Sequence, residues 1–289
     1  MHGKARSSLH LTIKEVDELA IFSAKLHRKL HRADHDIRLL EKELMALDAI
    51  EAHLQDQEIE ERVLSQSSAF ANPELIEEMN HQKERLKRAR SQHEKLKAQV
   101  SEISKQDAVE KYGDGTIRIK MDLLFPSKIL DDGSVEVDNG PRTIIMEMAS
   151  LELMPHSVHT FLEMVSEGLL DGCSFIINAL HVLKAAPLPY DGSSAHIKAK
   201  QFTEAGLESV AFREYSQDFP HKKYTVGFAA DGSPSFYINS EDNSEIHVGD
   251  PCFARVISGF DAVKRLDNMP TRNEIWFEKR VGIKKVLIL

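Results

Sequence analysis

A heptad pattern in the first part of the chain limits what that part can fold into. The first hundred residues contain almost no Gly or Pro, and apolar or small residues recur at steps of three and four. The series is Leu9, Thr12, Val16, Leu19, Ser23, Leu26, Leu30, Ala33, Ile37, Leu40, Leu44, Leu47 and Leu54, with only Glu51 out of place. This repeat predicts a coiled-coil helix over about residues 9–66. Its narrow apolar stripe needs a partner helix, because it cannot stay exposed to water.

A second helix is expected over about residues 73–108. Asn72 can cap the free amide groups, Pro73 suits the first helical position, and Glu74 complements the helix dipole. A weaker heptad series follows: Leu75, Met79, Gln82, Leu86, Ala89, His93, Leu96, Val100 and Ile103. The two helices either fold back as an antiparallel hairpin or pair with another chain, such as a second copy of this one. Residues 1–110 are therefore predicted to form a helical domain with a helical partner.

Composition argues against several classes of partner. The net charge is -9, whereas nucleic-acid binding favours an excess of Lys and Arg, so no nucleic-acid partner is expected. No apolar run approaches the roughly 20 residues that cross a bilayer, so no membrane contact is expected. His27, His31 and His35 lie on one helical face, but Arg28 and Arg32 add positive charge and no further ligand is near. We therefore predict no metal site and no cofactor.

The two cysteines bear on location. Cys173 and Cys252 are far apart in the sequence and are interpreted as inert core residues. Together with the absence of an Asn-x-Ser/Thr site, they favour a cytoplasmic location. A targeting segment upstream of Met1 would change that expectation, so the compartment stays open.

The pattern changes from helical to β-type after "KYGDGT" at residues 111–116. Short apolar runs follow, separated by turn signals such as "DDGS" and "ADGS": "TIRIKMDLLF", "SVEVDNGPRTIIMEM", "CSFIINALHVL", "YTVGFAA", "SFYIN", "CFARVI" and "KKVLIL". Two helices interrupt them, "PHSVHTFLEMVSEG" and "GFDAVKRLDN". Residues 111–289 are therefore predicted to form a closed antiparallel β-barrel with two short helices, which makes the chain α+β.

The order of these elements resembles that of the cyclophilin-type peptidyl-prolyl cis-trans isomerases over about residues 115–289. "RTIIMEMASLELMPHSVHTFLEMVSEG" is similar to the family's second strand and first helix, and "GCSFIINALHVLKAAP" occupies the place of its G-S-x-F-H-R stretch. "SPSFYINS" resembles G-S-Q-F-F-I, and "DPCFARVISGFDAVKRL" resembles H-x-V-F-G-x-V-x-x-G-x-x-V. Since each motif is altered, the resemblance depends on their order and spacing.

The resemblance implies a shallow apolar pocket for a proline ring beside an arginine that donates hydrogen bonds to the twisted amide. The family's F-H-R triplet falls on Phe175, Ile176 and Ile177, so an isoleucine stands at the arginine position. The other pocket positions fall on Val182, Leu183, Ala185, Ala229, Ala230, Ser235 and Tyr237. The rim loop, which in the family supplies a tryptophan and a histidine, has Glu245, Ile246 and Asp250 at the equivalent positions.

We therefore expect no catalytic residue at the family's arginine position and a degenerate rim at Ala185, Glu245 and Asp250. Phe175, Val182, Leu183, Ala229, Ser235, Tyr237 and Ile246 are the candidates for a peptide pocket. The leading hypothesis is a catalytically impaired pseudo-isomerase that binds a proline-containing peptide or protein segment. An active isomerase with a rebuilt site, using Lys184, His181, Arg213 or His247, and a purely structural coiled-coil scaffold are the alternatives.

Overall fold

The computed structural model describes residues 73–127, 138–179 and 181–289. The predicted helix over residues 9–66 and the three histidines on it lie outside the described residues, as does part of the run "SVEVDNG". The chain divides into two compact units, residues 1–100 and residues 101–289. The sequence predicts this boundary ten residues later, at residue 110, where the helical pattern ends. That pattern does not reveal that the last turns of the helix pack within the second unit.

The long helix α2 spans Pro73–Tyr112 and thus begins at the proline expected to start it. It ends with Lys111 in its last turn, followed by Gly113 in the left-handed region, a common way to end a helix. No helix in the described ranges is both long and apolar enough to span a bilayer. The partner helix of the heptad series stays a prediction.

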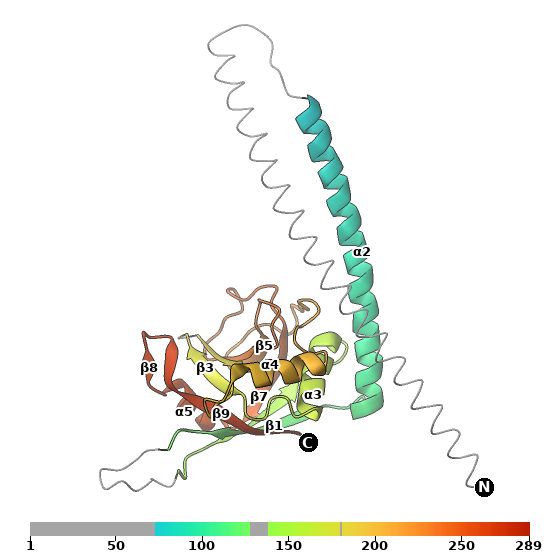
Figure 1. Ribbon diagram of the computed structural model, residues 1–289. Helices are drawn as coiled ribbons and strands as arrows, with labels where there is room; N and C mark the ends of the chain where they lie inside the picture. Colours follow the sequence, from blue (N-terminus) through green and yellow to red (C-terminus); the bar gives the residue numbers. More distant parts are fainter. Residues whose placement is uncertain (1–72, 128–137, 180) are drawn as a thin grey trace, which may run out of the picture. The chain divides into compact units, whose positions relative to one another are not determined.

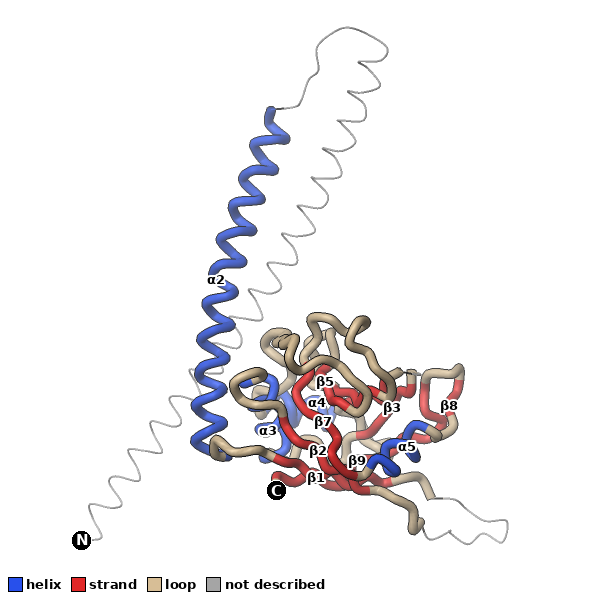
Figure 2. The backbone as a smooth tube through the Cα atoms, turned by 180° about the vertical axis from the view of Figure 1, so that it is seen from behind, coloured by secondary structure: helices blue, strands red, loops and turns tan. Residues whose placement is uncertain are grey.

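Eight strands of the second unit close into an antiparallel barrel, as predicted (Figures 1 and 2). Their order is β1-β2-β7-β5-β6-β4-β3-β9, and β1 pairs with β9 to complete the ring, while the short β8 adds to β9. The bounds are β1 Arg118–Leu124, β2 Thr143–Met148, β3 Ser174–Asn178, β4 Val182–Ala186, β5 Thr225–Phe228, β6 Phe236–Asn239, β7 Cys252–Ser258, β8 Thr271–Arg272 and β9 Trp276–Ile288. Closure leaves the ring with no free edge.

Alternating side chains fill the barrel. In β1 the buried residues Ile119, Met121 and Leu123 alternate with more exposed ones, as expected for a strand with one face on the core. Phe161 from α3 lies at the centre of an aromatic cluster, with ring centroids 4.8 Å from Phe253 and 5.4 Å from Phe236. This cluster ties the first barrel helix to strands β6 and β7.

Helix α3, Pro155–Ser166, and helix α5, Phe260–Asp267, are the two predicted short helices. The amides of His156 and Ser157 at the start of α3 donate to the buried Glu214 carboxylate, at 3.2 and 2.8 Å. A carboxylate at this end also complements the helix dipole. The sequence does not reveal this cap, because Glu214 lies 57 and 58 residues further along the chain.

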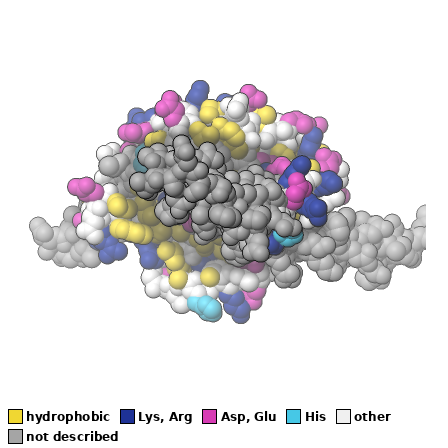
Figure 3. All heavy atoms as spheres, turned by 90° about the horizontal axis from the view of Figure 1, so that it is seen from above, with side chains coloured by type: hydrophobic (Ala, Val, Ile, Leu, Met, Phe, Trp, Pro, Cys, Tyr) yellow, Lys and Arg dark blue, Asp and Glu magenta, His cyan; other side chains and the backbone are white. Residues whose placement is uncertain are grey.

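Two features differ from the sequence prediction. A third short helix, α4 at Ala195–Glu204, was not expected; of its residues only Phe202 is buried, so its apolar periodicity is weak. The run "CSFIINALHVL" forms two strands, β3 and β4, that pair as a hairpin, with the Ala179 amide donating to the Val182 carbonyl at 3.0 Å. The run conceals such a reversal because it contains no Gly, Pro or Asp, and Asn178, the turn-favouring residue nearest the reversal, is the last residue of β3. On the face drawn in Figure 3, acidic, basic and hydrophobic side chains are interspersed.

Candidate functional site

A row of paired residues crosses the outer face of the barrel at the predicted arginine position. Ile177 on β3 pairs with Trp276 on β9 and with Lys184 on β4, and Lys184 pairs in turn with Tyr237 on β6. Directly paired residues of an antiparallel sheet project from the same face. The row therefore brings together an indole, an aliphatic side chain, an ammonium group and a phenol. Trp276 is the only tryptophan of the chain, and 42% of it is exposed.

Three of the predicted site residues lie on the opposite face. Phe175, Leu183 and Ala185 are fully buried members of the hydrophobic core. The alternation of β4 explains this placement, since Leu183 and Ala185 flank the outward Lys184. These side chains cannot contact a peptide on the outer face, so the pocket floor predicted from Leu183 is not formed there.

Lys184 is the cation that the strand register brings next to Ile177. Its side chain is 25% exposed, and its Nζ lies 3.4 Å from Asp231 Oδ2. Asp231 belongs to the β5–β6 turn, where Asp231 Oδ1 also accepts from the Ser233 amide at 2.9 Å. The ammonium is therefore held toward the turn, and it is a donor beside Ile177, the residue predicted to stand at the family's arginine position.

The ring of Tyr237 is covered by two histidines. Ring centroids lie 5.7 Å apart between Tyr237 and His221 and 5.2 Å apart between Tyr237 and His247, and only 4% of Tyr237 is exposed. Burial raises the pKa of the Tyr237 phenol, so the hydroxyl stays neutral and can donate. Because the phenol ring is already covered, it offers no open surface to a proline ring.

His221 occupies its place because residue 227 is a glycine. A Cβ at Gly227 would lie 2.6 Å from His221 Cε1 and 2.6 Å from the Pro251 carbonyl oxygen, well below ordinary contact. The ring of His221 is fixed by hydrogen bonds, with Nδ1 3.2 Å from Asn239 Nδ2 and Nε2 3.0 Å from the Asp250 carbonyl oxygen. Burial lowers the pKa of His221, which agrees with a neutral ring that accepts at Nδ1 and donates at Nε2.

The loop between β6 and β7 is anchored by Asp250. Its carboxylate lies 3.1 Å from His247 Nδ1 and 3.5 Å from Arg213 Nη1. Glu245 and Ile246 are both exposed, Ile246 to 67%. The acidic rim residue Asp250 is thus an internal anchor, and the residue predicted as an apolar pocket wall lies in solvent.

The remaining predicted residues lie near the two ends of β6. Ala229 and Ser235 are buried and joined by a backbone hydrogen bond of 2.9 Å, whereas Ala230 is exposed. Val182 is half-buried at the start of β4. Sequence reasoning missed His221 and Trp276, which come from segments far from the family's motifs, and no local signal marks them.

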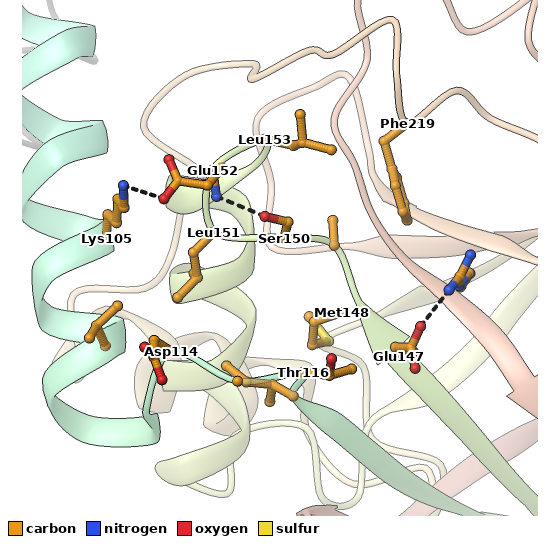
Figure 4. A pocket seen from close by; sticks show the side chains of 15 residues that line it. Lys105, Asp114, Thr116, Glu147, Met148, Ser150, Leu151, Glu152, Leu153 and Phe219 are labelled. Atoms are coloured by element: carbon orange, nitrogen blue, oxygen red, sulfur yellow. Dashed lines mark hydrogen bonds and ion pairs between the residues drawn. The ribbon is translucent and has the colours of Figure 1, made fainter.

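A separate cavity of about 490 Å³ lies near the end of α2 (Figure 4). Met148, Leu151 and Thr116 are among its lining side chains, with the Lys105–Glu152 ion pair at its edge. The Glu147 carboxylate, which pairs with Arg255, also lines it. None of the site residues predicted from the sequence line this cavity.

Comparisons with known proteins give a family match and similar solved structures. The family model described as cyclophilin type peptidyl-prolyl cis-trans isomerase/CLD matches residues 134–288. A crystal structure of a cyclophilin-type peptidyl-prolyl cis-trans isomerase from Cryptosporidium parvum aligns with 61% of this chain and 98% of its own, at 13% identity and a TM-score of 0.45. A second structure of that isomerase, in the presence of the dipeptide Ala-Pro, covers 60% and 98% at 14% identity, with a TM-score of 0.44. A search of curated proteins found no match.

Proposed function

The chain belongs to the cyclophilin-type peptidyl-prolyl cis-trans isomerase family, and on that premise we propose that its barrel is a catalytically impaired, protein-binding module. Its partner is a proline-containing peptide or protein segment. The observation that carries the proposal is the row itself. Ile177 stands at the position matched to the family's arginine, and the Tyr237 ring, which follows Lys184 along the row, is covered by His221 and His247.

The missing donor weakens catalysis for a physical reason. Isomerisation must overcome the resonance barrier of the amide, roughly 18–20 kcal/mol. An isoleucine cannot donate a hydrogen bond to the twisted amide, and losing one donor to a transition state typically costs 10²–10³-fold in rate. The covered phenol adds to this loss, because a proline ring has no exposed aromatic floor on which to bind.

A protease-coupled assay with a prolyl peptide and the full chain at high concentration tests the proposal. We expect a rate equal to that of uncatalysed isomerisation, unchanged by Ile177→Ala. Clear turnover that survives Ile177→Ala would contradict the proposed loss of activity.

A second candidate function, an isomerase with a rebuilt site, is favoured by Lys184. This side chain pairs with both Ile177 and Tyr237, so its ammonium is the donor nearest in register to the arginine position. If the assay detects turnover, Lys184→Met should abolish it while Lys184→Arg retains it. Turnover that Lys184→Met leaves intact excludes this lysine.

We propose that the peptide binds over the row of Trp276, Ile177 and Lys184. An exposed indole suits a proline ring, as in the aromatic-lined grooves that bind proline-rich segments. Trp276 is also the only intrinsic tryptophan fluorophore, so its emission reports on this face alone. A titration with a proline-containing peptide should shift the emission to shorter wavelength. Ile177→Asp should weaken the shift, whereas Ile197→Asp, an exposed isoleucine on α4, should not.

We propose further that the N-terminal helices recruit a helical partner and thereby join barrels into an oligomer. Pairing would raise the effective concentration of weak barrel contacts. Light scattering on the full chain and on residues 101–289 should give a multimer and a monomer, respectively. A monomeric full chain would favour an intramolecular hairpin instead. A full chain that assembles but binds no proline-containing peptide would favour a structural scaffold.

A further inference from the structure

A cluster of ionisable groups joins the end of α2 to α3, apart from the outer-face row. Asp107 and Lys111 face His159 and Glu163, and each pair is spaced one helical turn apart. His159 Nε2 lies 2.6 Å from Asp107 Oδ2 and 3.8 Å from Glu163 Oε1. One ligand atom from each of Asp107, His159 and Glu163 falls within 4.8 Å of the other two. Two carboxylates and one imidazole therefore converge on one point.

The ammonium of Lys111 marks that point as a place for positive charge. Its Nζ lies 3.0 Å from Asp107 Oδ2 and 3.0 Å from Glu163 Oε2, so it bridges both carboxylates. Although burial opposes the charge, the hydrogen bonds to Glu163 and Asp107 raise the pKa of Lys111. The side chain is also 42% exposed, so the ammonium can leave for solvent without disturbing the packed residues.

Two of the three ligating groups are more buried than the lysine, while the Asp107 side chain, 37% exposed, is held by its contacts with His159 and Lys111. The side chains of His159 and Glu163 are only 13% and 19% exposed. The Tyr112 hydroxyl donates to Glu163 Oε1 at 2.8 Å and so orients that carboxylate. Hydrogen bonds of this kind typically position metal ligands and strengthen binding.

We propose that Asp107, His159 and Glu163 form a binding site for a divalent transition metal, with Zn²⁺ as the best fit, in which the metal replaces the Lys111 ammonium. The imidazole favours Zn²⁺ over Ca²⁺ and Mg²⁺, which prefer oxygen ligands. Three protein ligands leave a fourth position open, as in zinc sites that hold a water. Without metal, the same residues form a lysine-bridged ion network that fastens the end of α2 to α3.

Calorimetric titration of the full chain with Zn²⁺ tests the site through differences between variants. The chain has 14 histidines, so other sites can add background. His159→Asn should remove one class of sites or weaken it at least tenfold, while His196→Asn, an exposed histidine on α4, should change nothing. Lys111→Met should tighten the same class about tenfold, because it removes the competing cation, and Lys97→Met should not.

Equal isotherms for the native chain and His159→Asn would overturn the proposal, as would weaker binding in Lys111→Met. Circular dichroism verifies that each variant is folded. If His159→Asn is not, the visible absorption of bound Co²⁺ in Asp107→Asn and Glu163→Gln decides instead. Both variants should lose the tetrahedral signal of the native chain, and spectra that match the native one would exclude these carboxylates as ligands.

Discussion

Replacing Gly227 with alanine tests the packing that covers Tyr237. The added Cβ would lie 2.6 Å from His221 Cε1, 2.6 Å from the Pro251 carbonyl oxygen and 3.1 Å from Tyr237 Cζ. The His221 ring can move only by losing its hydrogen bonds, and the Pro251 carbonyl is backbone, so the strand and the loop must separate. Overpacking of this kind typically costs about 1–3 kcal/mol. The lower conformational entropy of an unfolded chain with alanine offsets about 0.4–1 kcal/mol of it.

We therefore expect Gly227→Ala to lower the free energy of unfolding by about 1–2 kcal/mol, or Tm by about 3–6 °C for a unit of this size. Urea unfolding followed by Trp276 fluorescence measures the effect, since this fluorophore lies in the barrel. The slope with urea should stay constant while the midpoint falls. Gly115→Ala is the matched control, because a Cβ there would meet nothing within 4 Å.

A double-mutant cycle separates the two contacts. In a His221→Ala background, Gly227→Ala should cost less than in the native chain, because one of the two closest contacts is gone. A Gly227→Ala variant as stable as Gly115→Ala would refute the placement of His221 over the sheet, and with it the covered phenol on which the proposed loss of activity depends.

Three further perturbations address charges and caps. Burial lowers the pKa of His221, so the folded state binds fewer protons than the unfolded one. The free energy of unfolding should therefore fall as the pH drops below about 6.5. This fall should be smaller in His221→Gln. The hydrogen bond from His159 lowers the pKa of Asp107 from 3.8 to about 2. After a discount for solvent exposure, Asp107→Asn should lower the free energy of unfolding by about 1 kcal/mol at pH 7. Urea midpoints should show this difference fading as the pH falls from about 4 toward 2. Glu214→Gln should lower the urea midpoint by the equivalent of about 1–2 kcal/mol, because the amides at the start of α3 lose a charged acceptor. For each of the three variants, an unchanged midpoint would contradict the interaction that it removes.

Local patterns in the sequence predict most of the barrel. Alternation in β1 and the aromatic run of β6 identify strands, and Pro155 identifies the start of α3. These signals succeed because a strand with one face on the core and a helix start each depend on neighbouring residues alone. Helix α4 is not predicted, because its single buried residue, Phe202, leaves no apolar period in the sequence.

The candidate site was predictable only in part. The prediction that the family's arginine is replaced follows from one residue, Ile177, and needs no structure. Predicting that Phe175 and Leu183 face the core requires the strand register, because shifting a strand by one residue exchanges its two faces. The cover over Tyr237 required the loop path, since His221 and His247 reach the phenol from opposite sides of β6 in the sequence.

By itself, the sequence predicts that Ile177 stands where the family has an arginine, because matching a motif to a stretch of chain needs no folded structure. Local periodicity also predicts most of the strands and two of the three short helices, since it depends on neighbouring residues alone. Only the tertiary structure decides that Lys184 and Trp276 flank Ile177 and that Asp107, His159 and Glu163 converge. Those groupings arise from pairing and packing between distant segments, and the energies that select them are absent from any short stretch of chain.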